Sequence, residues 1–137
     1  MRFCSIASGS SGNCIYVGSD NTHVLVDIGI SGKKMETGLN SLELTGRDLD
    51  GILITHEHSD HIKGLGVISR KYGIPIYATG GTVDAMMRTN ALGKIPEGIF
   101  HEIREDESFM INDLKVNPFT IPHDAAQPVG YRLEHDG

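Results

Sequence analysis

The amino-acid sequence predicts an α/β sandwich. Short apolar segments separated by turn residues open the chain, strands then alternate with amphipathic helical segments, and a second run of strands follows toward the end. With 39% hydrophobic and 22% charged residues among 137, the composition is ordinary for a globular domain. The sequence has no repeat at the periods of solenoid proteins. We therefore expect a single domain over residues 1–137.

The first part of the chain predicts an antiparallel meander, one helix and a buried strand. Apolar, β-prone residues predict strands at Arg2 to Ala7, Cys14 to Val17 and His23 to Asp27. Ser31 is a good N-cap for a helix that reaches about Leu44, because Met35, Leu39 and Leu42 follow at helical spacing. The continuous apolar segment Gly51 to Thr55 predicts a strand buried on both faces.

The remaining elements alternate before the second strand run begins. Periodicity and turn residues predict helices at Ile62 to Tyr72, ending at Gly73, and at Thr82 to Leu92, with a strand at Ile74 to Ala78 between them. The last predicted strands are Phe109 to Ile111, Leu114 to Ile121 and Val129 to Leu133.

Net charge, apolar runs and cysteines indicate which classes of protein the sequence fits. A formal charge of -6 provides no general attraction for a phosphate backbone, so any nucleic-acid role must depend on local patches and bound metal. No apolar run approaches the roughly 18 residues of a membrane span, and the first residues are too short for a secretion signal. We expect a cytoplasmic protein without a membrane partner, in which Cys4 and Cys14 are buried, reduced thiols.

The strongest chemical signal is a cluster of histidines and a carboxylate directly after a buried strand. His56, His58, Asp60 and His61 follow the pattern His-x-His-x-Asp-His. Imidazole and carboxylate ligands without cysteine favour zinc, manganese or iron over calcium. The alternative is that Ser59 or Asp60 caps the next helix while the histidines are solvated. We interpret the segment as a divalent-metal site.

A further ligand is needed, because His56 and His58 alone leave the coordination sphere of a metal incomplete. His123 is the candidate, since it ends an apolar run as His56 does and precedes polar residues; the alternative is a histidine in a surface loop. The other histidines lie in segments that predict exposure, at positions His23, His101 and His135.

Three segments, in matching order, closely resemble the metallo-β-lactamase-fold hydrolase superfamily: Leu25 to Gly29, Thr55 to His61 and Pro122 to Asp124. The resemblance covers the whole chain and implies an αββα sandwich. It implies that His56, His58 and His123 bind one metal and that Asp60 and His61 bind a second. It also implies that Asp27 supports the metal-binding loop rather than binding metal, the alternative being a plain turn at a strand end.

Longer segments resemble the WalJ-type bacterial exonucleases within this superfamily. These are the turn Ser8 to Asn13, the segment Gly51 to His61, and the later Ile121 to Gly130. The resemblance implies a nucleic-acid substrate. It also implies two divalent ions, zinc or manganese with iron as the alternative, that activate a water, and Asp60 as the catalytic residue that orients or deprotonates this water. Ser11 and Asn13 are candidates for binding substrate phosphate, although a simple hairpin turn explains them equally well.

The sequence also departs from the family pattern. The family uses an aspartate that bridges both metals and a final histidine, both farther along than this sequence extends. We therefore expect the N-terminal half of the sandwich plus the start of its second sheet, truncated at the C-terminus, which pairs with another copy or with the missing half. Activity of these 137 residues alone stays open. The alternative functions are a thioester or lactone hydrolase of the same fold, or a non-catalytic metal-binding domain.

Overall fold

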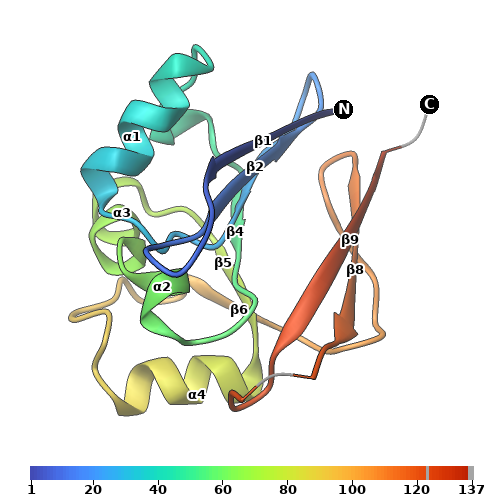
Figure 1. Cartoon of the computed structure of the whole chain (residues 1–137). Coiled ribbons are helices and arrows are strands. Elements are labelled where there is room, and N and C mark those ends of the chain that lie inside the picture. The colour runs from blue at the N-terminus through green and yellow to red at the C-terminus, as the bar shows by residue number, and fades with distance from the viewer. Residues whose placement is uncertain (123, 136–137) are drawn as a thin grey trace.

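The protein is built as a layer of helices, a large mixed sheet and a smaller sheet, in that order (Figure 1). The computed structural model describes residues 1–122 and 124–135. The large sheet has six strands in the order β1-β2-β3-β4-β5-β6, and the small sheet has three in the order β7-β8-β9. These layers confirm the predicted α/β sandwich.

The large sheet begins as the predicted antiparallel meander of β1 (Arg2–Ala7), β2 (Cys14–Gly18) and β3 (His23–Val26). The next strands, β4 (Gly51–Leu53), β5 (Ile76–Thr79) and β6 (Phe100–Ile103), each run parallel to their preceding neighbour. The connections between the parallel strands contain α1 (Gly32–Ser41), the short 3-10 helix η1 (Gly46–Asp48), α2 (Ser59–Ile62), α3 (Leu65–Tyr72) and α4 (Gly80–Arg88).

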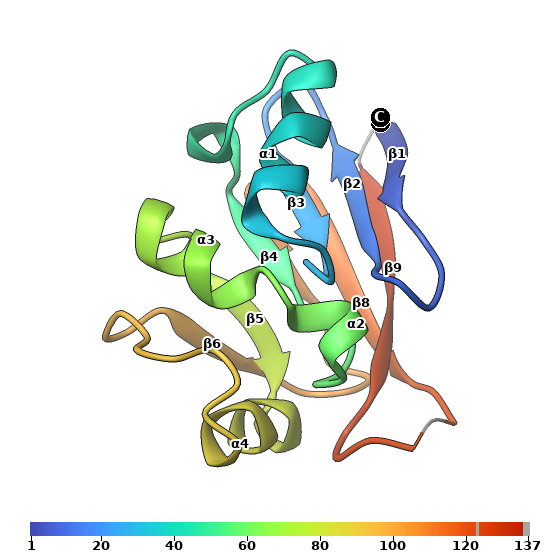
Figure 2. The same ribbon diagram turned by 60° about the vertical axis from the view of Figure 1, so that its left-hand side comes forward.

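Strand order explains why the helices share one face of this sheet (Figure 2). The strands β3 to β6 are added in one direction, so crossovers of the usual right hand all pass over the same face. The other face is covered by the antiparallel small sheet, made of β7 (Phe109–Ile111), β8 (Leu114–Thr120) and β9 (Val129–His135).

The central strand β4 is buried on both faces, as predicted. Ile52 packs into the apolar cluster beneath the helices, while Leu53 packs into a second cluster between the two sheets. Both side chains are fully buried, and each such burial stabilises the fold by about 1.5–3 kcal/mol. The strand therefore anchors both layers at the point where the histidine cluster begins.

Several element boundaries differ from the prediction. The helix predicted to reach about Leu44 ends at Ser41, and the strand predicted to reach Thr55 ends at Leu53. The helix predicted from Ile62 is divided: Ile62 ends the short α2, and α3 begins at Leu65, after Gly64, whose amide donates to the Ile28 carbonyl at 2.9 Å. The helix predicted from Thr82 begins at Gly80 because the Thr79 side chain caps it by accepting from the Thr82 amide. This helix also ends earlier than predicted, at Arg88.

The cysteines and the outlying histidines largely follow the predictions. Cys14 is buried, and burial raises the pKa of its thiol to about 12, whereas Cys4 is only half-buried. His101 and His135 are exposed. The prediction for His23 was wrong: the residue is half-buried, and its Nδ1 lies 2.6 Å from the Tyr16 hydroxyl. Within the described residues, none of the helices combines the length and apolar character needed to cross a membrane.

A cluster of polar side chains joins the two sheets at the turn between β7 and β8. Both carboxylate oxygens of Asp113 accept from the Ser19 hydroxyl at 2.9 Å, and Oδ1 also accepts from the Thr22 hydroxyl. His135 Nε2 lies 2.9 Å from Asp113 Oδ2. The Thr22 hydrogen bond, followed by those from Ser19 and His135, lowers the pKa of Asp113 to about 2.

Replacing Asp113 with asparagine is expected to reduce the acid sensitivity of the fold. The folded pKa lies below the unfolded value, so the carboxylate stabilises the fold above about pH 4 and this contribution is lost as the pH falls toward about 2. Asp113→Asn removes that titration. Urea unfolding across this window should show a smaller fall in the free energy of unfolding for the variant than for the wild type, and equal slopes would contradict the assignment.

Candidate metal centre

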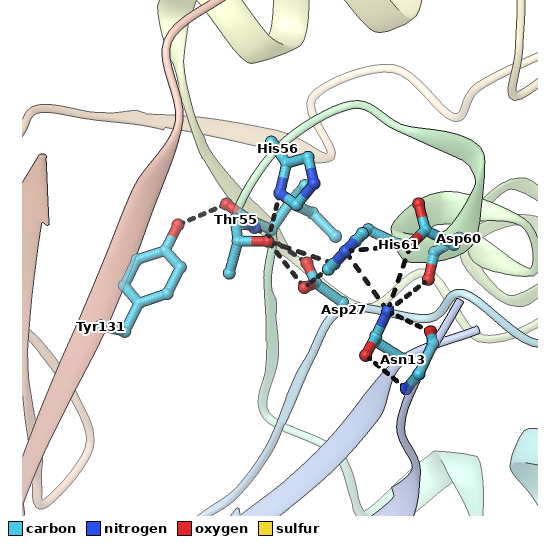
Figure 3. Close-up of polar contacts among 9 residues, drawn as sticks. Asn13, Asp27, Thr55, His56, Asp60, His61 and Tyr131 are labelled. Atoms are coloured by element: carbon cyan, nitrogen blue, oxygen red, sulfur yellow. Dashed lines mark hydrogen bonds and ion pairs between the residues drawn. The ribbon is translucent and has the colours of Figure 1, made fainter. Parts of the chain in front are cut away.

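The candidate metal centre lies where parallel strands of the large sheet end. Asp27 follows β3 directly, and residues Thr55 to His61, which we call the metal loop, follow the buried segment that contains β4. The carboxyl ends of parallel strands meet at one edge of a sheet, where side chains from separate strands converge. Figure 3 shows Asp27, Thr55, His56 and His61 gathered there.

The structure brings together three of the predicted ligands. Candidate ligand atoms of His56, His58 and Asp60 all lie within 4.8 Å of one another. The ring centroids of His56 and His61 are 3.8 Å apart, and His61 Nε2 lies 3.5 Å from Asp60 Oδ2. His56 is 3% exposed, while the other three are half-buried. A compact set of imidazoles and a carboxylate fits a divalent transition metal.

The carboxylate of Asp27 supports this cluster from below. It is 3% exposed, its Oδ1 accepts from the Thr55 amide at 2.8 Å, and its Oδ2 accepts from the Thr55 hydroxyl at 2.7 Å. His61 Nδ1 lies 2.6 Å from the same Oδ2. Because an ionised carboxylate only accepts, Nδ1 of His61 carries the proton and Nε2 carries the lone pair that a metal would use.

One hydroxyl extends this support to a second ring. Thr55 Oγ1, which donates to Asp27, lies 2.9 Å from Nδ1 of His56. A single buried carboxylate thus orients His61 directly and His56 through Thr55. Nothing in the sequence pattern pointed to Thr55 beyond its place next to His56.

Asp27 occupies its position through an unusual backbone conformation. Its φ of 63° lies in the left-handed region, which costs a non-glycine residue on the order of 1–3 kcal/mol. Burial raises the pKa of Asp27, opposed by hydrogen bonds from His61 and Thr55. Burial lowers the pKa of His61, but the hydrogen bond and charge of Asp27, with the charge of Asp60, raise it more, so the net pKa is raised.

The turn between β1 and β2 packs against the metal loop. The Asn13 amide donates to the Asp60 carbonyl at 2.8 Å, and its side-chain Nδ2 lies 3.4 Å from Asp60 Oδ2 and 3.3 Å from His61 Nε2. Ser11 is exposed in the same turn. Of the two residues predicted to bind substrate, Asn13 therefore also contacts two candidate ligands.

The small sheet holds the start of the metal loop. The Val129 amide donates to the Thr55 carbonyl at 3.0 Å, and the Tyr131 hydroxyl donates to the Ile54 carbonyl at 2.7 Å (Figure 3). Burial raises the pKa of Tyr131 well above its usual value, so the phenol stays protonated and remains a donor. These contacts were not predicted from the sequence.

Replacing Tyr131 with phenylalanine is expected to cost about 1 kcal/mol of stability, because the Ile54 carbonyl loses its hydroxyl donor. Chemical denaturation measures this loss. Tyr77→Phe is the matched control, since Tyr77 packs between the same sheets and its hydroxyl makes no hydrogen bond with residues of the described chain. A loss as large in the control would assign the effect to packing.

Two predictions remain: the capping role of Ser59 or Asp60, and the ligand role of His123. The capping alternative for Ser59 and Asp60 is not observed, because the N-cap of α2 is His58 and no side chain caps it. The predicted ligand His123 lies outside the described residues, so its role stays a prediction.

Comparisons with known proteins agree with this architecture. The family model described as "Metallo-beta-lactamase superfamily" matches residues 7–135. The chain is 44% identical to the exodeoxyribonuclease YycJ of Bacillus anthracis, covering 99% of this chain and 51% of that protein. It is 42% identical to the exodeoxyribonuclease WalJ of Streptococcus pneumoniae serotype 2, with the same coverage of 99% and 51%. The chain thus spans about half the length of the curated relatives it matches.

The fold is also shared with a solved structure. The subclass B3 metallo-beta-lactamase MEM-A1, from a soil metagenome library, superposes with a TM-score of 0.76 at 19% identity, covering 98% of this chain and 55% of that one. That similarity concerns the fold alone. The family match over most of the chain, together with the layers and the histidine cluster, shows that this chain belongs to the metallo-beta-lactamase superfamily.

Proposed function

We propose that this chain forms the metal-binding part of a metal-dependent exodeoxyribonuclease. The observation that carries the proposal is the cluster of His56, His58 and Asp60, supported by Asp27, in a chain 44% identical to an exodeoxyribonuclease. The ligands of a first divalent ion, zinc or manganese, would be His56, His58 and His123. Those of a second would be Asp60 and His61.

The side chains around the cluster have separate tasks in this proposal. Bound divalent ions would lower the pKa of a water and neutralise phosphate charge. Asp60 would accept a hydrogen bond from the attacking water and orient it, while Asp27 and Thr55 keep the histidine rings in place. Because the chain carries a formal charge of -6, the positive charge that attracts DNA would come mainly from the ions.

The turn between β1 and β2 is the proposed contact for substrate phosphate. Ser11 is exposed there, so its hydroxyl is accessible to a ligand. Asn13 stays a candidate as well, although its side chain already contacts Asp60 and His61. A cytoplasmic location and self-association, or association with a C-terminal half, also stay predictions; sedimentation tests the association.

The test compares substrates on the metal-loaded chain. End-labelled single- and double-stranded DNA, a thioester and a lactone would be offered with zinc or manganese, and the variant lacking both His56 and His58 is the control. Release of nucleotides that needs the metal and both histidines supports the proposal. Thioester or lactone turnover without nucleolysis would identify another hydrolase, and bound metal without any turnover would favour a metal-binding role for this chain.

A further inference from the structure

The loop between β8 and β9 lies beside both the metal loop and α4. Its residues 124–128, which we call the β8–β9 loop, include the exposed Asp124 and Ala126, and the first fully buried side chain after it is Val129. Apolar packing therefore contributes little to the position of this loop. Hydrogen bonds from neighbouring elements must hold it instead.

The first of these hydrogen bonds comes from the metal loop. Glu57 Oε2 accepts from the Ala126 amide at 3.0 Å. Glu57 stands between His56 and His58, yet it does not belong to the cluster of candidate ligands found in the described chain. Its other oxygen, Oε1, is buried and has no hydrogen-bond partner among the described residues. Such an oxygen destabilises a fold, so general stability does not explain the carboxylate.

The second set of hydrogen bonds comes from the opposite side. Gln127 Oε1 accepts from the Gly81 amide at 2.7 Å, in the first turn of α4, and Gln127 Nε2 donates to Glu105 at 2.8 Å. The Gln127 carbonyl accepts from the Thr79 hydroxyl at 2.8 Å. A Cβ on Gly81 would lie 2.6 Å from Gln127 Cβ, so glycine permits the close approach of the loop to α4 (Figure 1).

We propose that Glu57 and Gln127 are positioning residues that hold the β8–β9 loop against the metal loop before a metal binds. The loop begins one residue after His123, so fixing it restricts where a ligand at that position can lie. The inference rests on the proposed function, in which His123 binds metal. It adds that the residue between the first two histidines links two ligand-bearing segments.

Two conservative variants separate the hydrogen bond from the charge. Glu57→Gln keeps an oxygen that can accept from Ala126 but removes the charge, whereas Glu57→Asp keeps the charge and shortens the side chain. Hydrogen exchange at the Ala126 amide is measured in the metal-free chain, and zinc affinity by competition with a chromophoric chelator. Glu107→Ala is the control, because Glu107 is exposed and its side chain makes no hydrogen bond with the described residues.

We expect E57D to exchange faster at Ala126 and to bind zinc about 10-fold more weakly, as is common when a residue that supports a ligand is removed. E57Q and the control should match the wild type in both measurements, and Gln127→Ala should resemble E57D. Unchanged exchange in E57D, or loss of zinc affinity in E57Q equal to that in E57D, would overturn the proposal.

The variant His123→Ala distinguishes this inference from the proposed function. If H123A binds zinc as tightly as the wild type, the assignment of His123 as a ligand fails. Faster exchange at Ala126 in E57D would then still support the hydrogen bond from Glu57 to the loop, while its effect on zinc affinity would be absent. If both H123A and E57D weaken zinc binding, both proposals are supported.

Discussion

Replacing His56 with alanine is expected to weaken the binding of a divalent metal by at least about 100-fold, more than the loss of a supporting residue usually causes. His56 is 3% exposed, and its ring centroid lies 4.8 Å from that of His58 and 3.8 Å from that of His61. In the proposed metal centre, this change removes a buried nitrogen ligand that a water cannot replace at equal affinity. Competition with a chelator measures the change for zinc and for manganese.

The control for this experiment is His101→Ala. His101 is exposed on β6, and it lies outside the cluster of candidate ligands in the described part of the chain. The metal affinity of this control variant should equal that of the wild type. Equal metal affinity in the His56 variant and the control would remove His56 from the metal centre.

Replacing Gly29 with alanine is expected to destabilise the fold by about 3 kcal/mol or more, at the upper end of the usual cost of overpacking. A Cβ at this position would lie 1.7 Å from the Asp60 carbonyl oxygen and 2.6 Å from the Asn13 nitrogen. The Gly29 amide also donates to the Asn13 carbonyl at 2.8 Å. The added methyl group must therefore push the first turn and the metal loop apart, so metal affinity should fall as well.

Urea unfolding and chelator competition measure the two effects in the Gly29 variant. Gly73→Ala is the matched control: Gly73 has a φ of 64°, and nothing lies within 4 Å of an added Cβ. Gly73→Ala should lower the free energy of unfolding by only about 1–2 kcal/mol, because alanine disfavours the left-handed conformation, and it should leave metal affinity unchanged. A Gly29 variant no less stable than this control would show that the metal loop can move away without cost.

Local signals made part of the fold predictable. Ser31 caps α1 through its side chain, and Gly73 ends α3 in the left-handed conformation, because both features depend on neighbouring residues alone. β6 was missed because two of its four residues, His101 and Glu102, are exposed and polar. Its pairing with β5, rather than its own sequence, makes it a strand.

The same distinction applies to the candidate site. The spacing of His56, His58 and Asp60 predicted a cluster because these residues are neighbours in the chain, and the structure places their ligand atoms together. The hydrogen bond from Tyr131 to Ile54 joins residues 77 positions apart. Contacts of that kind depend on how the two sheets pack, and a single sequence carries little information about that packing.

The attachment of β9 to the metal loop also limits which changes in chain length the protein can accept. Tyr131 reaches the Ile54 carbonyl through its side-chain hydroxyl, while Val129 reaches the Thr55 carbonyl through its backbone amide. A shift of β9 by one residue can place Gly130 where Tyr131 lies, and glycine has no hydroxyl to donate. Insertions in the short segment from Val129 to Tyr131 are therefore poorly accommodated, because they change the register of β9 and with it the position of the start of the metal loop.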